Sequence, residues 1–220
     1  MELYNTIIND EEIIKIYNSI SEFEDKDNGW AHHDLKHVKN VAYMVEKILK
    51  NLNYDENFIE EAKIAAILHD TGCIKGKDGH AERSYEFAKI YLEKNNIKLT
   101  YQKPVLEAIK IHSNGFDTDN IIALALIFSD KLDIKYTRVA KEGYNIYGMR
   151  QLQFINDITV NIQDNYLKIN FICDKNINII ELEDFYFTDK VFKAIKSFAK
   201  KLSLDAIVEI NNKKWNKFYL

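Results

Sequence analysis

The spacing of apolar residues changes once along this chain, and that change constrains its fold more than any other feature of the sequence. Up to about residue 145, apolar residues recur every three or four positions, as they do in amphipathic helices. Between residues 158 and 173 they alternate with polar residues on both sides of the turn "QDN", which predicts a β-hairpin. We therefore predict a mainly α protein, with a helical bundle over residues 1–148 and a small α+β domain of unknown role over residues 149–220.

Within the first part, the periodicity predicts a succession of helices with short breaks between them. They are expected at residues 11–23, 35–52 with Asp34 as N-cap, 57–70, 80–95, 103–112 and 118–134. The helix over 57–70 is apolar on nearly all sides in its second half, so it should be the central buried helix, and Gly72 is expected to end it in a left-handed conformation. In the tail we expect a short strand at 177–180, a helix capped by Thr188 and a last strand in "DAIVEI".

Composition excludes several classes of protein. The 220 residues, 46% of them hydrophobic, are enough for a buried core, and the net charge of −4 gives no reason to expect long nucleic acids or anionic membranes as partners. No stretch approaches the roughly 18 apolar residues of a membrane span, and the acidic start does not resemble a secretory signal. Cys73 and Cys173 lack any CxxC spacing, so we expect two reduced thiols without an assigned role, in a cytoplasmic protein.

The histidines are distributed unevenly, which suggests a single site. All of them fall in the predicted helical part, at His32, His33, His37, His69, His80 and His112. The adjacent pair His69 and Asp70 closes the predicted buried helix. Asp130 lies in the apolar run "ALALIFSDKLD", where an unpaired carboxylate would be strongly disfavoured by desolvation. Imidazoles and carboxylates that converge on a dry interior suit a divalent metal ion. Without a metal, Asp130 would instead pair with Lys131 or Arg138.

Four of these residues follow one another in an order that resembles a known family. His37, His69, Asp70 and Asp130, within "HVKNV", "LHDTG" and "SDKLD", resemble the pattern of the HD-domain metal-dependent phosphohydrolases over residues 30–140. The resemblance implies that these four residues bind a first metal ion.

The same resemblance concerns two further histidines. It implies that His80 and His112 hold a second ion, with Asp70 bridging the two ions. The segments "GHAERSYEFAK" and "AIKIHSNG" are similar in particular to the branch that hydrolyses diadenosine polyphosphates symmetrically. Some two-metal branches have a pair of histidines where this chain has His112 and Ser113, so the second ion is expected to have fewer ligands or to be absent.

The expected activity is that of a metal-dependent phosphohydrolase. Two divalent ions about 3.5 to 4 Å apart can acidify a water molecule and stabilise the charge that develops on a phosphoryl group. A metal-bound hydroxide would then attack a nucleotide or another small phosphate ester or anhydride. Mixed His and Asp ligands suit Mn, Fe, Co, Ni, Zn or Mg, so the metal stays open, as does the presence of a homo-oligomer.

Several charged residues near the ligands are expected to contact the substrate, although such side chains are commonly solvated surface charges. We assign Asp70, Lys131 and Arg138 to catalysis. We assign His33, Lys75, Lys77 and Arg83 to substrate binding.

Two other functions compete with this hypothesis. One is a regulatory module that binds a nucleotide as a signal without turning it over, and a complete set of ligands argues against it. The other is hydrolysis of guanosine polyphosphates, which is disfavoured because no clear Glu-Asp pair stands between the HD pair and Asp130.

Overall fold

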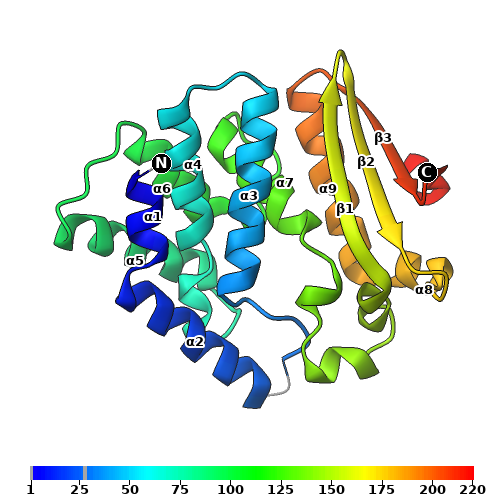
Figure 1. Ribbon diagram of the computed structural model, residues 1–220, viewed down its shortest axis with the longest axis horizontal. Coiled ribbons are helices and arrows are strands. Elements are labelled where there is room, and N and C mark those ends of the chain that lie inside the picture. The colour runs from blue at the N-terminus through cyan, green and yellow to red at the C-terminus, as the bar shows by residue number, and fades with distance from the viewer. Residues whose placement is uncertain (1, 27–28) are drawn as a thin grey trace. The chain divides into compact units, whose positions relative to one another are not determined.

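The computed structural model describes residues 2–26 and 29–220, which form two compact units. The first unit comprises residues 2–23 and 33–130, and the second comprises residues 24–26, 29–32 and 131–220. Helices dominate, and the sheet lies in the C-terminal part of the chain (Figure 1), so the predicted fold class is confirmed. The functional boundary after residue 148 stays a prediction.

The first unit consists of helices joined by short connections. Its elements are α1 (Glu2–Ile8), α2 (Glu11–Lys26, up to residue 23), α3 (Leu35–Asn51), α4 (Glu56–Leu68), the 3-10 helix η1 (Thr71–Lys75), α5 (His80–Lys94), α6 (Gln102–Ile111) and α7 (Ile121–Leu132, up to residue 130). Each helix predicted here is present within a few residues. The prediction lacked α1, because two turns are too short to show a helical period.

Helix α4 forms the centre of this unit. It contacts α1, α3, α5 and α6, and Figure 1 shows α3 and α4 side by side. Its residues 64–68 are fully buried, which agrees with the apolar character of this segment on all sides. Because the helix is buried, the residues that follow its last turn, His69 and Asp70, also lie in the interior.

The start of α3 is fixed by the predicted cap. The Asp34 side chain accepts a hydrogen bond from the backbone N–H of His37 over 2.8 Å, which satisfies one of the free donors of the first turn. This cap fixes His37 in the first turn, where its side chain is buried.

The prediction for Gly72 is wrong. In the loop after α4, the glycines with positive φ are Gly76 and Gly79, whereas Gly72 lies within η1. Gly72 is needed for a different reason: a Cβ atom there would lie 2.3 Å from the carbonyl oxygen of His80 and 2.7 Å from the backbone nitrogen of Ser84. The Gly72 N–H also donates to Ser84 Oγ over 2.9 Å. The absence of a side chain therefore allows α5 to pack directly against the loop.

The second unit combines short 3-10 helices with a sheet and two helices. Its elements are η2 (Tyr136–Arg138), η3 (Lys141–Asn145), η4 (Met149–Phe154), β1 (Ile155–Gln163), β2 (Tyr166–Cys173), α8 (Ile179–Asp184), α9 (Tyr186–Lys201), β3 (Asp205–Ile210), β4 (Lys213–Lys214) and η5 (Asn216–Tyr219). The strand order is β1-β2-β3-β4. Strands β1 and β2 form the predicted antiparallel hairpin, and β3 pairs parallel to β2 after the crossover through α9.

Two details of the tail differ from the prediction. The strand expected at 177–180 is absent, because the Asn178 side chain accepts a hydrogen bond from Glu181 N–H and so caps α8. Thr188 is not the N-cap of α9, which begins at Tyr186. Its hydroxyl donates to the carbonyl oxygen of Leu182 instead and so joins α8 to α9.

Within residues 2–26 and 29–220, no helix combines the length and the apolar character that a bilayer crossing requires.

Candidate metal centre

The four side chains expected to hold a first metal ion converge in the interior of the first unit. His37 Nε2 lies 3.5 Å from Asp70 Oδ2 and 3.3 Å from Asp130 Oδ1. His69 Nε2 lies 3.2 Å and 3.8 Å from the same two oxygens. Ligand atoms at about 2.0–2.2 Å from one ion are themselves about 3–4 Å apart. The four atoms, all within 4.8 Å of one another, therefore fit a common cation. We call them the first ligand set.

Three elements bring this set together. His37 comes from the first turn of α3, His69 and Asp70 follow the last turn of α4, and Asp130 lies in α7. The His69 ring is oriented by a 2.7 Å hydrogen bond between its Nδ1 and the carbonyl oxygen of Ala66. Because a carbonyl only accepts, Nδ1 is the donor, and this leaves Nε2 directed at the carboxylates.

A second group of side chains faces the other oxygen of Asp70. His80 Nε2 lies 3.4 Å from Asp70 Oδ1, and His112 Nε2 lies 3.5 Å from it. The two Nε2 atoms are 2.9 Å apart. Each ring is held through Nδ1 by a backbone carbonyl, that of Lys77 for His80 and that of Ile109 for His112. The two oxygens of Asp70 thus face different sets of imidazoles, which is the arrangement of a bridging carboxylate. We call Asp70 Oδ1 and these two histidines the second ligand set.

Cys73, which has no role assigned from the sequence, lies next to the second ligand set. Cys73 Sγ lies 3.5 Å from Asp70 Oδ1, and the ligand atoms of Asp70, Cys73 and His80 lie within 4.8 Å of one another. Ser113 Oγ is also close, 3.3 Å from His80 Nε2. The spacing of Asp70 and Cys73 could have revealed the thiol, but only with the knowledge that a 3-10 turn follows the HD pair.

The two carboxylates of this cluster are buried among imidazoles, and their charges are compatible with a bound cation. Burial lowers the pKa of His69, but the carboxylates of Asp70 and Asp130 outweigh this effect and raise it to about 10. Burial raises the pKa of Asp70, yet the facing imidazoles, His69 first, hold it well below its usual range. His69 Nε2 and Asp70 Oδ2 are buried and make no hydrogen bond within the described residues. Buried carboxylates and orphaned ligand atoms of this kind fit a divalent ion.

The pKa values of the histidines of the second set are lowered, whereas the pKa of His69 is raised. Burial lowers the pKa of His112 to about 4, and burial also lowers the pKa of His80. Both rings are therefore neutral near pH 7, and a neutral imidazole is the form that coordinates metal ions.

The residues predicted to bind substrate or to act in catalysis differ in their burial. His33 is buried, and its ring centroid lies 5.9 Å from that of His37. Lys75, the last residue of η1, and Lys77, in the loop between η1 and α5, are exposed. Lys131 and Arg138 are buried residues of the second unit. The functional roles of all five residues stay predictions.

The Arg83 side chain stabilises the segment between Asp70 and His80 through hydrogen bonds. Its guanidinium donates to the carbonyl oxygens of Gly72, over 2.9 Å, of Gly76 and of Asp78. The side chain therefore holds the chain between Asp70 and His80 in place, and its predicted contact with substrate stays a prediction.

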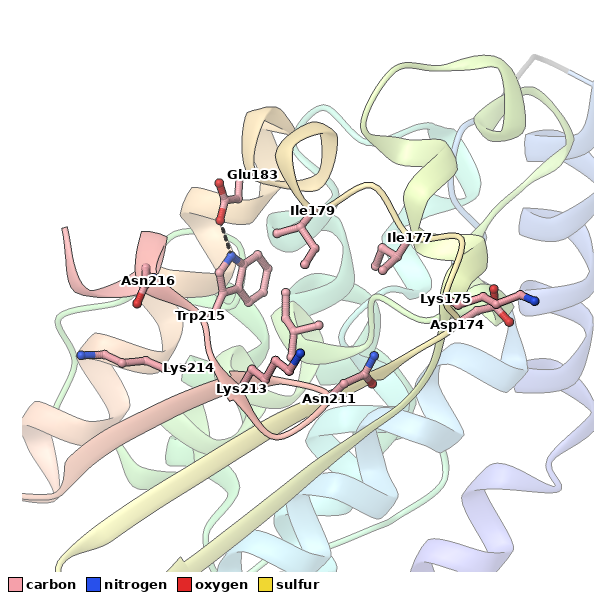
Figure 2. A pocket seen from close by; sticks show the side chains of 11 residues that line it. Asp174, Lys175, Ile177, Ile179, Glu183, Asn211, Lys213, Lys214, Trp215 and Asn216 are labelled. Carbon is pink, nitrogen blue, oxygen red and sulfur yellow. Dashed lines mark hydrogen bonds between the residues drawn. The ribbon is translucent and has the colours of Figure 1, made fainter.

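The second unit has a cavity of a different kind. Its volume is about 440 Å³, and it is lined by Ile177, Ile179, Trp215 and several charged residues. Figure 2 shows Trp215 beside Ile179, with its indole N–H donating to Glu183 over 2.7 Å. None of the residues that line this cavity is a histidine or a cysteine. It therefore lacks the imidazole ligands that characterise the His and Asp cluster.

The fold and the cluster define a helical domain with a buried group of histidines and carboxylates that could hold a divalent metal ion. Residues 34–142 match the model of the family described as "HD domain". The match covers every residue of both ligand sets and supports the assignment of this part of the chain to the HD superfamily, whose members are generally hydrolases and typically bind divalent metals. The comparison with curated proteins finds no match for the chain.

Proposed function

We propose that the protein is a metal-dependent phosphohydrolase that acts on a nucleotide or another small phosphate ester or anhydride. One observation carries the proposal: the two oxygens of the buried Asp70 face two separate groups of imidazoles, at 3.2–3.5 Å. A buried carboxylate between two ligand sets has a clear use in a two-metal site, where it bridges the ions, and none in an apolar core.

The assignment of ligands follows from the distances. His37, His69, Asp70 and Asp130 would hold one ion, and Asp70, His80 and His112 the other. When bound, two divalent ions supply Lewis acidity toward a water molecule and toward a phosphoryl oxygen.

The exposure of the ligands indicates where substrate approaches. The side chains of His37, His69 and His112 are at most 1% exposed, whereas that of His80 is 15% exposed. Substrate would therefore approach from the side of His80. Lys75 and Lys77 lie on the exposed loop just before His80, so their charges would favour the approach of an anionic phosphate. Arg83 would keep this loop in position.

The identity of the substrate is the finer part of the proposal. The similarity of "GHAERSYEFAK" and "AIKIHSNG" to the diadenosine-polyphosphate branch favours a dinucleoside polyphosphate. A small substrate is also what the HD domain suggests.

The test is hydrolysis of a panel of phosphates by full-length protein reconstituted separately with Mn, Fe, Co, Zn and Mg. The panel contains diadenosine tetraphosphate, a guanosine polyphosphate, nucleoside mono-, di- and triphosphates and a simple aryl phosphate. We expect sustained hydrolysis that a chelator abolishes and that returns on adding metal. Binding of a nucleotide without turnover under every metal would overturn the proposal in favour of a sensing module.

A matched pair of variants controls this test. Asp70→Asn keeps the shape of the side chain but removes its charge, and we expect activity to fall by at least about 10²-fold, since even the loss of an outer-shell partner of a metal ligand costs about 10- to 100-fold. Asp78→Asn makes the same chemical change at an exposed position of the same loop and should retain activity. Equal activity of the two variants would contradict the proposed role of Asp70.

A further inference from the structure

We propose that the Cys73 thiolate is a protein ligand of the second set, so that this half of the centre prefers thiophilic ions such as Zn²⁺, Co²⁺ and Fe²⁺ over Mg²⁺ and Mn²⁺. The inference rests on the proposed metal-binding function, and it concerns which atoms bind and which metal they select.

The Cys73 sulfur and two imidazole nitrogens lie at similar distances from one oxygen of Asp70. Cys73 Sγ, His80 Nε2 and His112 Nε2 all approach the same atom, Asp70 Oδ1, at 3.5, 3.4 and 3.5 Å. Ligands placed tetrahedrally around Zn²⁺, at about 2.0–2.1 Å for nitrogen and oxygen and about 2.3 Å for sulfur, lie about 3.3–3.8 Å apart. The separations of these three atoms from Oδ1 fall in this range, and Sγ also lies within 4.8 Å of the His80 ligand atom, so Cys73 can share an ion with Asp70 and His80.

The backbone between Asp70 and Cys73 places their side chains close together. Cys73 lies three residues after Asp70 within a tight turn, in which the Cys73 N–H donates to the Asp70 carbonyl oxygen over 2.9 Å. Residues three apart in a 3-10 turn lie one above the other, so Sγ and the carboxylate share one face. Because Gly72 has no side chain, α5 packs directly against this turn, and its first residue, His80, lies at that same face.

The two cysteines of the chain have different surroundings. Cys73 is 2% exposed and lies against a carboxylate and an imidazole, whereas Cys173 lies in β2 with its thiol 3.7 Å from the carbonyl oxygen of Phe171. Burial raises the pKa of Cys173 to about 11, so its thiol stays protonated. Cys173 is therefore a matched control: it is also a free, buried thiol, and it belongs to none of the metal-ligating groups found among the described residues.

Coordination by Cys73 is a simple exchange of a proton for a metal ion. In the metal-free protein the thiol donates to Asp70 Oδ1. On binding, the S–H proton leaves to solvent and the sulfur lone pair forms the bond to M²⁺, with no change of oxidation state. Soft thiolate selects Zn²⁺ and the later transition metals, while Mg²⁺ and Mn²⁺ prefer oxygen ligands.

The experiment is a Co²⁺ titration of metal-free, full-length protein, followed by absorption spectroscopy. We expect a thiolate-to-cobalt charge-transfer band in the near ultraviolet that appears with one of two bound ions. The band should be unchanged in Cys173→Ser and absent in Cys73→Ser. In the latter variant one Zn²⁺ should bind at least about tenfold more weakly, while the other ion is unaffected.

The spectrum of the wild-type protein tests whether Cys73 binds Co²⁺ even if Cys73→Ser fails to fold. Two bound Co²⁺ ions without the band would show that Cys73 is only a small buried side chain beside Asp70, which overturns this inference and leaves the proposed hydrolase intact. A band that persists in Cys73→Ser would overturn it too. Absence of any bound Co²⁺ would overturn the metal centre itself, and with it both proposals.

Discussion

The His and Asp cluster of the first unit and the cavity of the second unit place their polar side chains in opposite ways. In the first unit, imidazoles and carboxylates leave solvent and meet around Asp70, at less than 10% exposure for both Asp70 and Asp130. In the second unit, the lysines that line the cavity, Lys175, Lys213 and Lys214, remain exposed. Burial of titratable groups is unfavourable unless another interaction offsets it, so the first arrangement marks a site of chemistry. The second is ordinary for a surface hollow, and a cavity alone therefore says little about function.

The largest expected effect comes from removing one ligand of the first set. His37→Ala should lower hydrolysis by at least about 10²-fold and reduce the bound metal by one ion per chain, because the second set retains its own ligands. Elemental analysis together with the kinetic assay provides the measurement. Retention of both ions would show that His37 is a buried structural residue.

A smaller effect is expected where no ligand is touched but the loop between the ligands is displaced. Gly72→Ala introduces a Cβ atom 2.3 Å from the carbonyl oxygen of His80, so η1 and α5 must separate. We expect a loss of about 1–3 kcal/mol in the free energy of unfolding, from chemical denaturation, and weaker binding of the second ion alone. Gly76→Ala tests the alternative cause, because at Gly76 the φ angle of +83° is strained for alanine while no atom lies within 4 Å. If both variants affect metal binding equally, close packing at Gly72 is not what positions His80.

The smallest effect is expected in the cavity of the second unit. Lys213→Ala should change the free energy of unfolding by less than about 0.5 kcal/mol and leave metal content and hydrolysis as in the wild type. Thermal unfolding and the same kinetic assay test this expectation. A clear loss of hydrolysis would contradict the contrast between the two units and assign the tail a part in the activity.

The sequence was sufficient to predict most of the helices, though not α1 or α8, and to predict that these histidines and carboxylates converge, for two physical reasons. Their role as metal ligands stays a prediction. The helical period is a local property, and a carboxylate such as Asp130 within an apolar helix needs a partner wherever the helix packs. The segment at 177–180 was misread because its isoleucines suit a strand, whereas the Asn178 cap, whose side chain accepts from Glu181 N–H, decides in favour of α8.

The contacts of Cys73, Gly72 and Arg83 could not be predicted from the sequence. All three depend on how the chain turns between Asp70 and α5, and this turn is fixed by contacts with α5 and not by a repeating pattern. Arg83 was predicted to contact phosphate from its charge and position, while the structure shows its guanidinium bonded to three backbone carbonyls.

The most direct test of the central claim is the metal content of Asp70→Asn beside the wild type, measured by elemental analysis after reconstitution and removal of loosely bound ions. If Asp70 bridges two ligand sets, the wild type will hold two ions per chain and the variant will lose affinity at both positions. A folded variant that still holds two ions as tightly as the wild type would contradict the account.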